Sequence, residues 1–258
     1  PAQWRRYRSL GIEPADAAFA PAIELPQGAA ASLAAGTATV KLENQTSFGR
    51  LHYTTDGSVP GAASAAYAAP FTVKLPATVR AAAFADDGTP LSAPRSRVLD
   101  RAALLSLRNG DLRACPDGDL GLRAPLLPDL GGSGVPAYDV DLFHACWIYP
   151  QAPLDTVTGV HIEAARLARN YALAHDQSKV VAYPAQTAHG ELEVRRDRCD
   201  GPVLARLPLP AGDAPGVTLD LRASLPRTQG VHDLCLRSTA PIAGPLYGIG
   251  AVQLLEGP

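Results

Sequence analysis

Residues 51–60 read LHYTTDGSVP, and this stretch decides the fold of the first part of the chain. Residues 51–55 alternate apolar and polar side chains, which is the period of a half-buried strand. Asp56 and Gly57 accept the backbone angles of a tight reversal, and Pro60 has no amide hydrogen with which to extend a ladder. The stretch therefore predicts a strand that ends in a turn.

The same period of two recurs on both sides of this stretch. Short alternating runs predict further strands, and Asp87-Gly88 predicts a second turn. Together they predict a small immunoglobulin-like sandwich over residues 27–99. The predicted strands are Thr37–Leu42, Gly49–Thr55, Phe71–Leu75 and Thr78–Ala85.

Residues 1–26 follow a different pattern. Trp4, Tyr7 and Leu10 share one helical stripe, and Gly11 suits a left-handed C-cap. A single short helix cannot bury its stripe alone, so we expect it to be the last helix of a preceding domain. Pro14, Pro21 and Pro26 and the Ala-rich residues 27–36 predict a connector.

The alternation of apolar and polar residues returns between residues 100 and 258. Eight or more strands over this length predict a jelly-roll β-sandwich. Residues 162–171 (IEAARLARNY) also fit a helix, and we interpret them as a strand or loop. The predicted strands are Ala137–Phe143, Ala145–Tyr149, Thr156–Ile162, Gly190–Arg195, Val203–Leu207, Val217–Leu221, Val231–Leu236 and Leu246–Leu255.

Composition excludes several classes of function. The chain has 258 residues, of which 47% are hydrophobic, so it can bury ordinary cores. A net charge of −2 leaves no basic surplus for phosphates, and we expect no nucleic-acid partner. Pro, Gly or charge interrupts every Ala-rich run, so no membrane span is expected. The chain begins with Pro1 and lacks methionine, which predicts a piece of a longer protein.

Four cysteines lie in the second half of the chain, at Cys115, Cys146, Cys199 and Cys235. None belongs to a C-x-x-C pair, so two disulfides fit better than a zinc site or four free thiols. Three connectivities are open to four cysteines. Disulfides predict an oxidising compartment, which is the periplasm or the outside of the cell.

Residues 51–60 resemble the Y-T-T-D-G-S-x-P pattern of a fibronectin-III-like module that follows the catalytic barrel in bacterial glycoside hydrolase family 20 β-N-acetylhexosaminidases and chitobiases. Residues 4–19 resemble the last helix and exit strand of that barrel. Residues 139–149 (DVDLFHACWIY) resemble a segment of the C-terminal domain of many of these enzymes. Residues 190–201 and 230–236 resemble the final strands of a family 6-type carbohydrate-binding jelly roll.

The resemblance implies the C-terminal region of a β-N-acetylhexosaminidase, whose partner is an upstream catalytic barrel of the same polypeptide. Such enzymes release terminal N-acetylhexosamine from chitooligosaccharides or glycans with a paired Asp-Glu. No Asp-Glu dipeptide occurs in this chain, so we assign no catalytic residue and expect no hydrolysis. We also expect no cofactor. The resemblance further implies that Cys115 pairs with Cys146 and Cys199 with Cys235.

Two roles stay open, a structural domain that braces the barrel and a carbohydrate-binding module for N-acetylhexosamine-containing glycans. Sugar modules stack pyranose rings on exposed aromatic side chains. The candidates are Tyr149, Tyr171, Tyr183 and Tyr247, whereas Trp147, beside a cysteine, fits the core. Against binding, residues 246–250 (LYGIG) lack the Asn or Asp of competent family 6 modules.

We expect no metal site. Asp139, Asp141 and His144 carry cation-ligand side chains at close spacing. Alternation places the two aspartates on one strand face, and a solvated face is the simpler explanation. His232, within a predicted strand, is expected to be structural.

Overall fold

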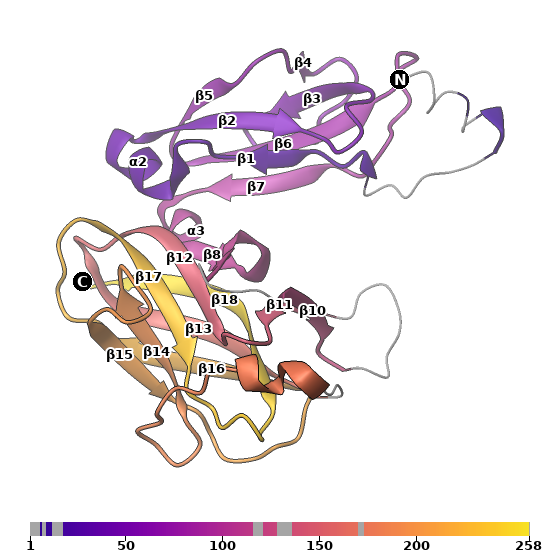
Figure 1. Cartoon of the computed structure of the whole chain (residues 1–258). Coiled ribbons are helices and arrows are strands. Elements are labelled where there is room, and N and C mark those ends of the chain that lie inside the picture. Colours follow the sequence, from indigo (N-terminus) through magenta and orange to yellow (C-terminus); the bar gives the residue numbers. More distant parts are fainter. Residues whose placement is uncertain are drawn as a thin grey trace. The chain divides into compact units, whose positions relative to one another are not determined.

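The computed structural model describes residues 6, 9–11, 18–115, 121–127, 136–169 and 173–257. The chain forms two compact units, Pro1–Leu104 and Leu105–Pro258. Figure 1 labels their elements. Both units are built from antiparallel strands, which confirms the predicted all-β fold class. The predicted N-terminal helix lies largely outside the described residues, and none of the described helices has the length and apolar character that crossing a bilayer requires.

The first unit is a sandwich of two sheets, with strand orders β1-β2-β5 and β4-β3-β6-β7. Buried side chains from both sheets, among them Val40, Val73 and Val79, form one core. Tyr53 stacks on Phe71 with ring centroids 3.9 Å apart, which joins the two sheets. The strands are β1 (Ala22–Glu24), β2 (Thr37–Glu43), β3 (Arg50–Thr54), β4 (Ala65–Ala66), β5 (Phe71–Lys74), β6 (Ala77–Phe84) and β7 (Arg95–Leu99).

The turn predicted after residue 55 is confirmed. Gly57 adopts a φ of 83°, a backbone angle that side chains with a Cβ rarely accept. The Asp56 carboxylate accepts hydrogen bonds from the Ser58 amide at 3.0 Å and the Ser58 hydroxyl at 2.6 Å. These bonds favour the charged form and lower the pKa of Asp56. In the second predicted turn, Asp87 accepts the amide hydrogen of Thr89 in the same way.

The predicted connector over residues 27–36 is wrong. Residues Gly28–Ala35 form helix α2, because alanine has the highest helix propensity and no β-branched residue interrupts the run. The helix ends at Gly36, which is left-handed and donates its amide hydrogen to the Leu33 carbonyl. Strand β1, which lies between Pro21 and Pro26, pairs with β2. The segment therefore extends the sandwich, and the short helix α3 (Arg101–Leu104) ends the unit.

The second unit is a jelly-roll sandwich. One sheet has the order β15-β14-β17-β12-β9 and the other β16-β13-β18-β8, with β10 and β11 as a separate pair. Apart from the β14–β15 hairpin, successive strands from β12 to β18 alternate between the two sheets, as in a jelly roll. The strands are β8 (Ser106–Arg108), β9 (Arg113–Ala114), β10 (Gly121–Pro125), β11 (Ala137–Asp141), β12 (Cys146–Pro153), β13 (Val157–Leu167), β14 (Glu191–Arg196), β15 (Val203–Pro208), β16 (Val217–Ser224), β17 (Val231–Ser238) and β18 (Leu246–Glu256), with short 3-10 helices η2 (Asn109–Asp111) and η3 (Ala174–Lys179).

Alternation along the strands of the larger sheet separates a core face from an outward face. Leu192 and Val194 of β14 lie beside Leu236 of β17, and all three are fully buried. On the other face of the same strands, Glu193 lies opposite Arg237 in the ladder. The residues of the candidate site therefore come from the outward face of the five-stranded sheet.

Candidate functional site

A cavity of about 630 Å³ opens on the second unit. Strands β9, β12 and β17 contribute to its wall, together with the loop that joins β14 to β15. Its size falls within the usual range of small-molecule sites. The residues that line it are Arg113, Ala114, Cys115, His144, Cys146, Ile148, Tyr183, Asp197, Arg198, Cys199, Asp200, Asp233 and Arg237.

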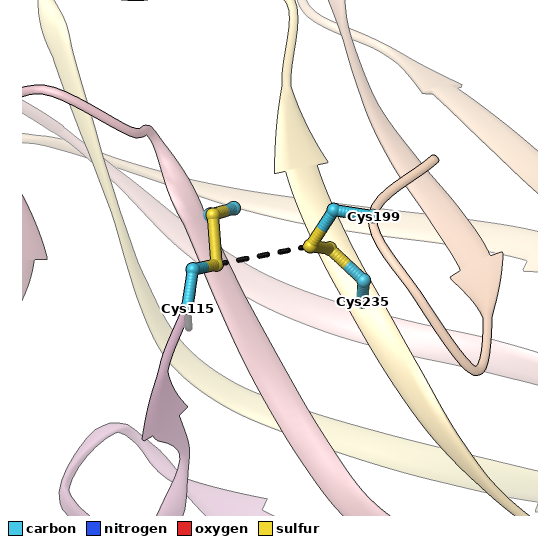
Figure 2. A group of neighbouring side chains, drawn as sticks. Cys115, Cys199 and Cys235 are labelled. Carbon is cyan, nitrogen blue, oxygen red and sulfur yellow. Dashed lines mark hydrogen bonds between the residues drawn. A yellow bond between two sulfur atoms is a disulfide. The ribbon is translucent and has the colours of Figure 1, made fainter. Parts of the chain in front are cut away.

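Two disulfides form part of the cavity wall. They join Cys115 to Cys146 and Cys199 to Cys235, which confirms the sequential pairing. The Sγ atoms of Cys115 and Cys199 are 3.9 Å apart (Figure 2), so the two cross-links contact each other. All four sulfur atoms lie within 4.8 Å of one another. Strands β9, β12 and β17 and the β14–β15 loop are thus tied together at one place.

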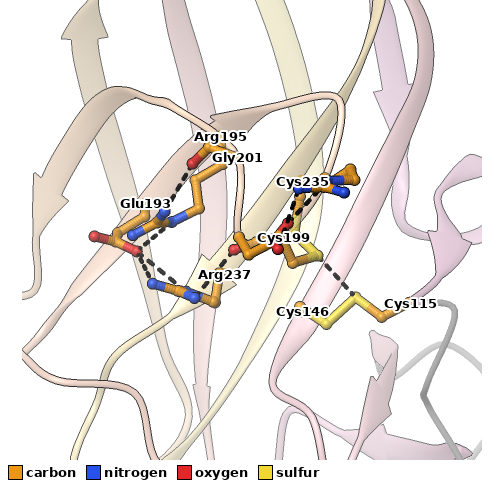
Figure 3. Close-up of a disulfide and its surroundings, with 10 residues drawn as sticks. Cys115, Cys146, Glu193, Arg195, Cys199, Gly201, Cys235 and Arg237 are labelled. Atoms are coloured by element: carbon orange, nitrogen blue, oxygen red, sulfur yellow. Dashed lines mark hydrogen bonds and ion pairs between the residues drawn. A yellow bond between two sulfur atoms is a disulfide. The ribbon is translucent and has the colours of Figure 1, made fainter.

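An ion cluster lies beside the disulfides (Figure 3). The Glu193 carboxylate, 2% exposed, accepts hydrogen bonds from Arg195 at 2.7 Å, Arg206 at 3.2 Å and Arg237 at 2.6 Å. Burial alone would raise the pKa of Glu193, but the bonds from Arg195 and Arg237 outweigh it and lower the pKa. Arg237 also donates to the carbonyl of Cys199 at 3.0 Å. The cluster therefore joins the sheet to the disulfide loop.

Most charges at the cavity have a partner of opposite sign. Arg113 pairs with Asp233 at 2.6 Å, and Arg198 pairs with Asp200 at 3.0 Å. Asp197 accepts a hydrogen bond from His232 at 2.8 Å, which raises the pKa of that imidazole. Compensated charges offer hydrogen-bond donors and acceptors without a strong field. These pairs consequently offer hydrogen bonds to an uncharged polar ligand.

Two further side chains bring an aromatic surface and a spare polar atom to the cavity. Tyr183 is half-buried, and the guanidinium of Arg237 lies 4.2 Å from the centre of its ring. The Nδ1 atom of His144 is buried and has no hydrogen-bond partner among the described residues. A buried polar atom without a partner is costly, so this nitrogen is available to a bound water or ligand.

The four tyrosines predicted to stack on sugars differ in their surroundings. Tyr149 and Tyr247 are 1% and 4% exposed, so neither ring offers a face to a ligand in this structure. Tyr149 lies opposite the core residue Leu234 in the ladder, and burial raises its pKa well above the usual range. Tyr171 lies outside the described residues. Of the three tyrosines that the structure describes, only Tyr183 lines the cavity.

The aspartates predicted to share a solvated face differ from each other. Asp139 is exposed and pairs with Arg123 at 3.0 Å, as that prediction requires. Asp141 is 6% exposed and accepts the amide hydrogens of Phe143 and His144, because it ends strand β11 and caps the turn that follows. The prediction is wrong for Asp141.

Sequence reasoning missed Glu193, Arg237 and Arg113. Apart from Arg195, which is two residues from Glu193, their partners lie at least 13 residues away, and no local motif joins them. The one signal in the sequence is a charged residue at position 193 between two apolar neighbours, which alternation places on an outward face.

Comparison with known protein families gives a match within the first unit. Residues 29–95 match the chitobiase/beta-hexosaminidase C-terminal domain. This match contains the LHYTTDGSVP stretch and confirms, for these residues, the resemblance that the stretch carries. The match ends within the first unit, and no curated protein matches the chain.

Among solved structures, the chain is similar to family 6 carbohydrate-binding modules. CsCBM6-3 from Clostridium stercorarium, in complex with cellobiose, is 15% identical, with a TM-score of 0.38 over 59% of this chain and 93% of the module. A Clostridium cellulolyticum module in complex with xylose is 14% identical, with a TM-score of 0.34 over 58% and 96%. A β-1,3-glucan-binding module from Bacillus halodurans is 11% identical, with a TM-score of 0.38 over 58% and 93%.

Proposed function

We propose that the chain is a non-catalytic accessory region of an exported β-N-acetylhexosaminidase. It would follow the catalytic barrel in the same polypeptide and serve a structural or substrate-presenting role. The match of residues 29–95 to the chitobiase/beta-hexosaminidase C-terminal domain carries this proposal. The lack of an Asp-Glu dipeptide in the sequence supports a non-catalytic role. The two disulfides support export, because they persist in oxidising compartments.

The carboxylates at the cavity also favour a non-catalytic role. Among the described lining residues, Asp197, Asp200 and Asp233 each contact a basic side chain. These ion pairs connect the loops and strands around the cavity, which is a structural use of the carboxylates.

The test has two arms. The purified chain, incubated with a chromogenic N-acetylglucosaminide, is expected to release no product above the buffer rate. The reading frame upstream of Pro1 is expected to encode a barrel with an adjacent Asp-Glu pair. Release of product, or an upstream frame without such a barrel, would contradict the proposal.

A second candidate function is binding of an N-acetylhexosamine-containing glycan in the cavity. The observation that favours it is the combination of Tyr183, the spare nitrogen of His144 and a wall of compensated charges. Aromatic rings stack on the apolar faces of sugars, and polar groups around them fix the orientation of hydroxyls.

Calorimetric titration of the chain with chitotetraose tests this candidate. If the cavity binds the glycan, Tyr183→Ala is expected to weaken binding by about tenfold. Val181→Ala is the matched control, because Val181 is 38% exposed in the same segment and does not line the cavity. A flat titration of the unaltered chain, or equal affinities of the two variants, would rule out the cavity as the glycan site.

A further inference from the structure

We propose that Cys115, Cys146, Cys199 and Cys235 form a tetrathiolate site for Zn²⁺ when their disulfides are reduced. The same four side chains would then have two states, a pair of disulfides and a single metal centre. This inference is independent of the accessory role and of any glycan binding, since it rests on the sulfur cluster alone.

The positions of the sulfur atoms carry the proposal. Tetrahedral zinc with Zn–S bonds of about 2.3 Å places its sulfur ligands about 3.8 Å apart. The Sγ atoms of Cys115 and Cys199, which belong to different disulfides, are already 3.9 Å apart (Figure 2). All four sulfurs lie within 4.8 Å of one another. The cluster is therefore compact enough to surround one ion.

Reduction only has to separate the two sulfurs of each pair. The Cα atoms of Cys115 and Cys146 are 6.0 Å apart, and those of Cys199 and Cys235 are 5.1 Å apart. Rotation about the Cα–Cβ bonds moves the sulfurs apart at these separations. No strand has to leave its sheet to open the site.

The surrounding charges match a tetrathiolate zinc centre. Four thiolates and one Zn²⁺ carry a net charge of two minus. In the neighbouring cluster, the single carboxylate of Glu193 faces the guanidiniums of Arg195, Arg206 and Arg237, which leaves two positive charges. Arg237 reaches the Cys199 backbone (Figure 3). This excess would offset the charge of the metal centre.

Burial and access are also suitable. Cys235, Cys146 and Cys115 are 0%, 2% and 6% exposed, so the ligands are shielded from bulk water. Cys115, Cys146 and Cys199 nevertheless line the cavity, which provides a route for a small reductant and for the ion. Thiolates are soft ligands that select zinc over magnesium or calcium.

The chemistry balances with a dithiol as reductant. Each disulfide accepts two electrons and two protons, while one dithiol is oxidised to its own disulfide. The four thiols that result lose four protons to solvent as the zinc binds, and the metal does not change its oxidation state. The bound ion would hold the same four positions together that the disulfides hold in the oxidised chain.

The experiment uses the whole chain, reduced with dithiothreitol without oxygen and freed of reductant by gel filtration. Titration with Co²⁺, as a spectroscopic probe, is expected to give the visible bands of tetrahedral cobalt and thiolate-to-metal charge transfer at one ion per chain. Zn²⁺ is expected to abolish these bands and to raise the melting temperature of the reduced chain. Absence of the bands overturns the proposal, as does a reduced chain that Zn²⁺ does not stabilise.

Two variants identify the ligands. Cys199→Ser/Cys235→Ser is expected to lose the tetrathiolate spectrum. Ile148→Val is the matched control, because Ile148 lines the same cavity but offers no metal-ligating atom, and it is expected to keep the spectrum. A spectrum that survives in the double cysteine variant would overturn the proposal. The unaltered chain supplies the deciding titration even where a variant does not fold.

Discussion

The two units of this chain are stabilised in different ways. The first encloses a core of valine, leucine and alanine between its sheets, and its sequence contains no cysteine. The second also has an apolar core, but on the outward face of its larger sheet it adds two disulfides and a carboxylate that contacts three arginines. Between the two sheets of the first unit, apolar burial is sufficient to stabilise the fold. Loops around an open cavity instead rely on covalent and ionic cross-links.

The largest expected effect comes from removing one cross-link. Cys199→Ala/Cys235→Ala opens a connection between residues 36 apart, and we expect it to lower the free energy of unfolding of the second unit by about 4 kcal/mol. Hydrogen exchange followed by mass spectrometry measures each unit separately. Protection in the first unit should stay unchanged. Equal loss of protection in both units would contradict the idea that this disulfide stabilises the second unit alone.

The ion cluster should have the next largest effect. Glu193→Gln removes the carboxylate and leaves three guanidiniums without their anion, so we expect a loss of about 3 kcal/mol from the second unit. Urea denaturation measures this loss of stability. Glu163→Gln is the control, because Glu163 is an exposed carboxylate on β13, and it should change stability by less than about 0.5 kcal/mol.

In the first unit, stability should depend on apolar packing. Leu99 is fully buried, and we expect Leu99→Ala to cost about 2.5 kcal/mol through lost burial and a residual cavity. Val98, its neighbour on β7, is 47% exposed, so Val98→Ala should have little effect. The same hydrogen-exchange measurement should locate the loss of Leu99→Ala in the first unit. Equal costs for the two variants would show that β7 is not held by its buried face.

The smallest effect is a dependence on pH in the second unit. The hydrogen bond that His232 donates to the Asp197 carboxylate raises the pKa of His232 above its ordinary value of 6.5. A raised pKa means that the protonated imidazole stabilises the fold at low pH, and that this contribution is lost as the pH rises through the raised pKa. The stability difference between the unaltered chain and His232→Gln should therefore be larger at about pH 5.5 than at about pH 8.5. A difference that grows with pH would contradict this.

Long alternating strands could be predicted from the sequence, whereas short edge strands could not. Each of the eight strands predicted in the second unit is present, because the alternation of strands such as β14 and β17 sets both their type and their buried face. Strands β4 and β9 have only two residues each and carry no period. Helix α2 was missed because its Ala-rich sequence has no amphipathic pattern, although alanine itself favours a helix.

The candidate site was less predictable than the fold. Tyr149 and Tyr247 were candidates for stacking on sugars because they are aromatic, but both occupy buried positions of their strands. Cysteine spacing favoured two disulfides but could not show that the disulfides contact each other, because that contact arises only when distant strands pair. Arg206 and Arg237 reach Glu193 from neighbouring strands whose register the sequence does not state.

Trp147 gives the second unit an internal optical reporter. Its indole is 4% exposed, donates to the Asp139 carbonyl at 2.9 Å and directly follows the disulfide-bonded Cys146. Successive residues of a strand point to opposite faces, so the indole lies on the core face of β12 and the Cys146 sulfur on its outward face. Emission should therefore change when the core packing around β12 loosens. With Trp4→Phe, Trp147 becomes the sole tryptophan in the sequence. Light emitted by this one side chain would then report the packing of the second unit's core, without any added dye.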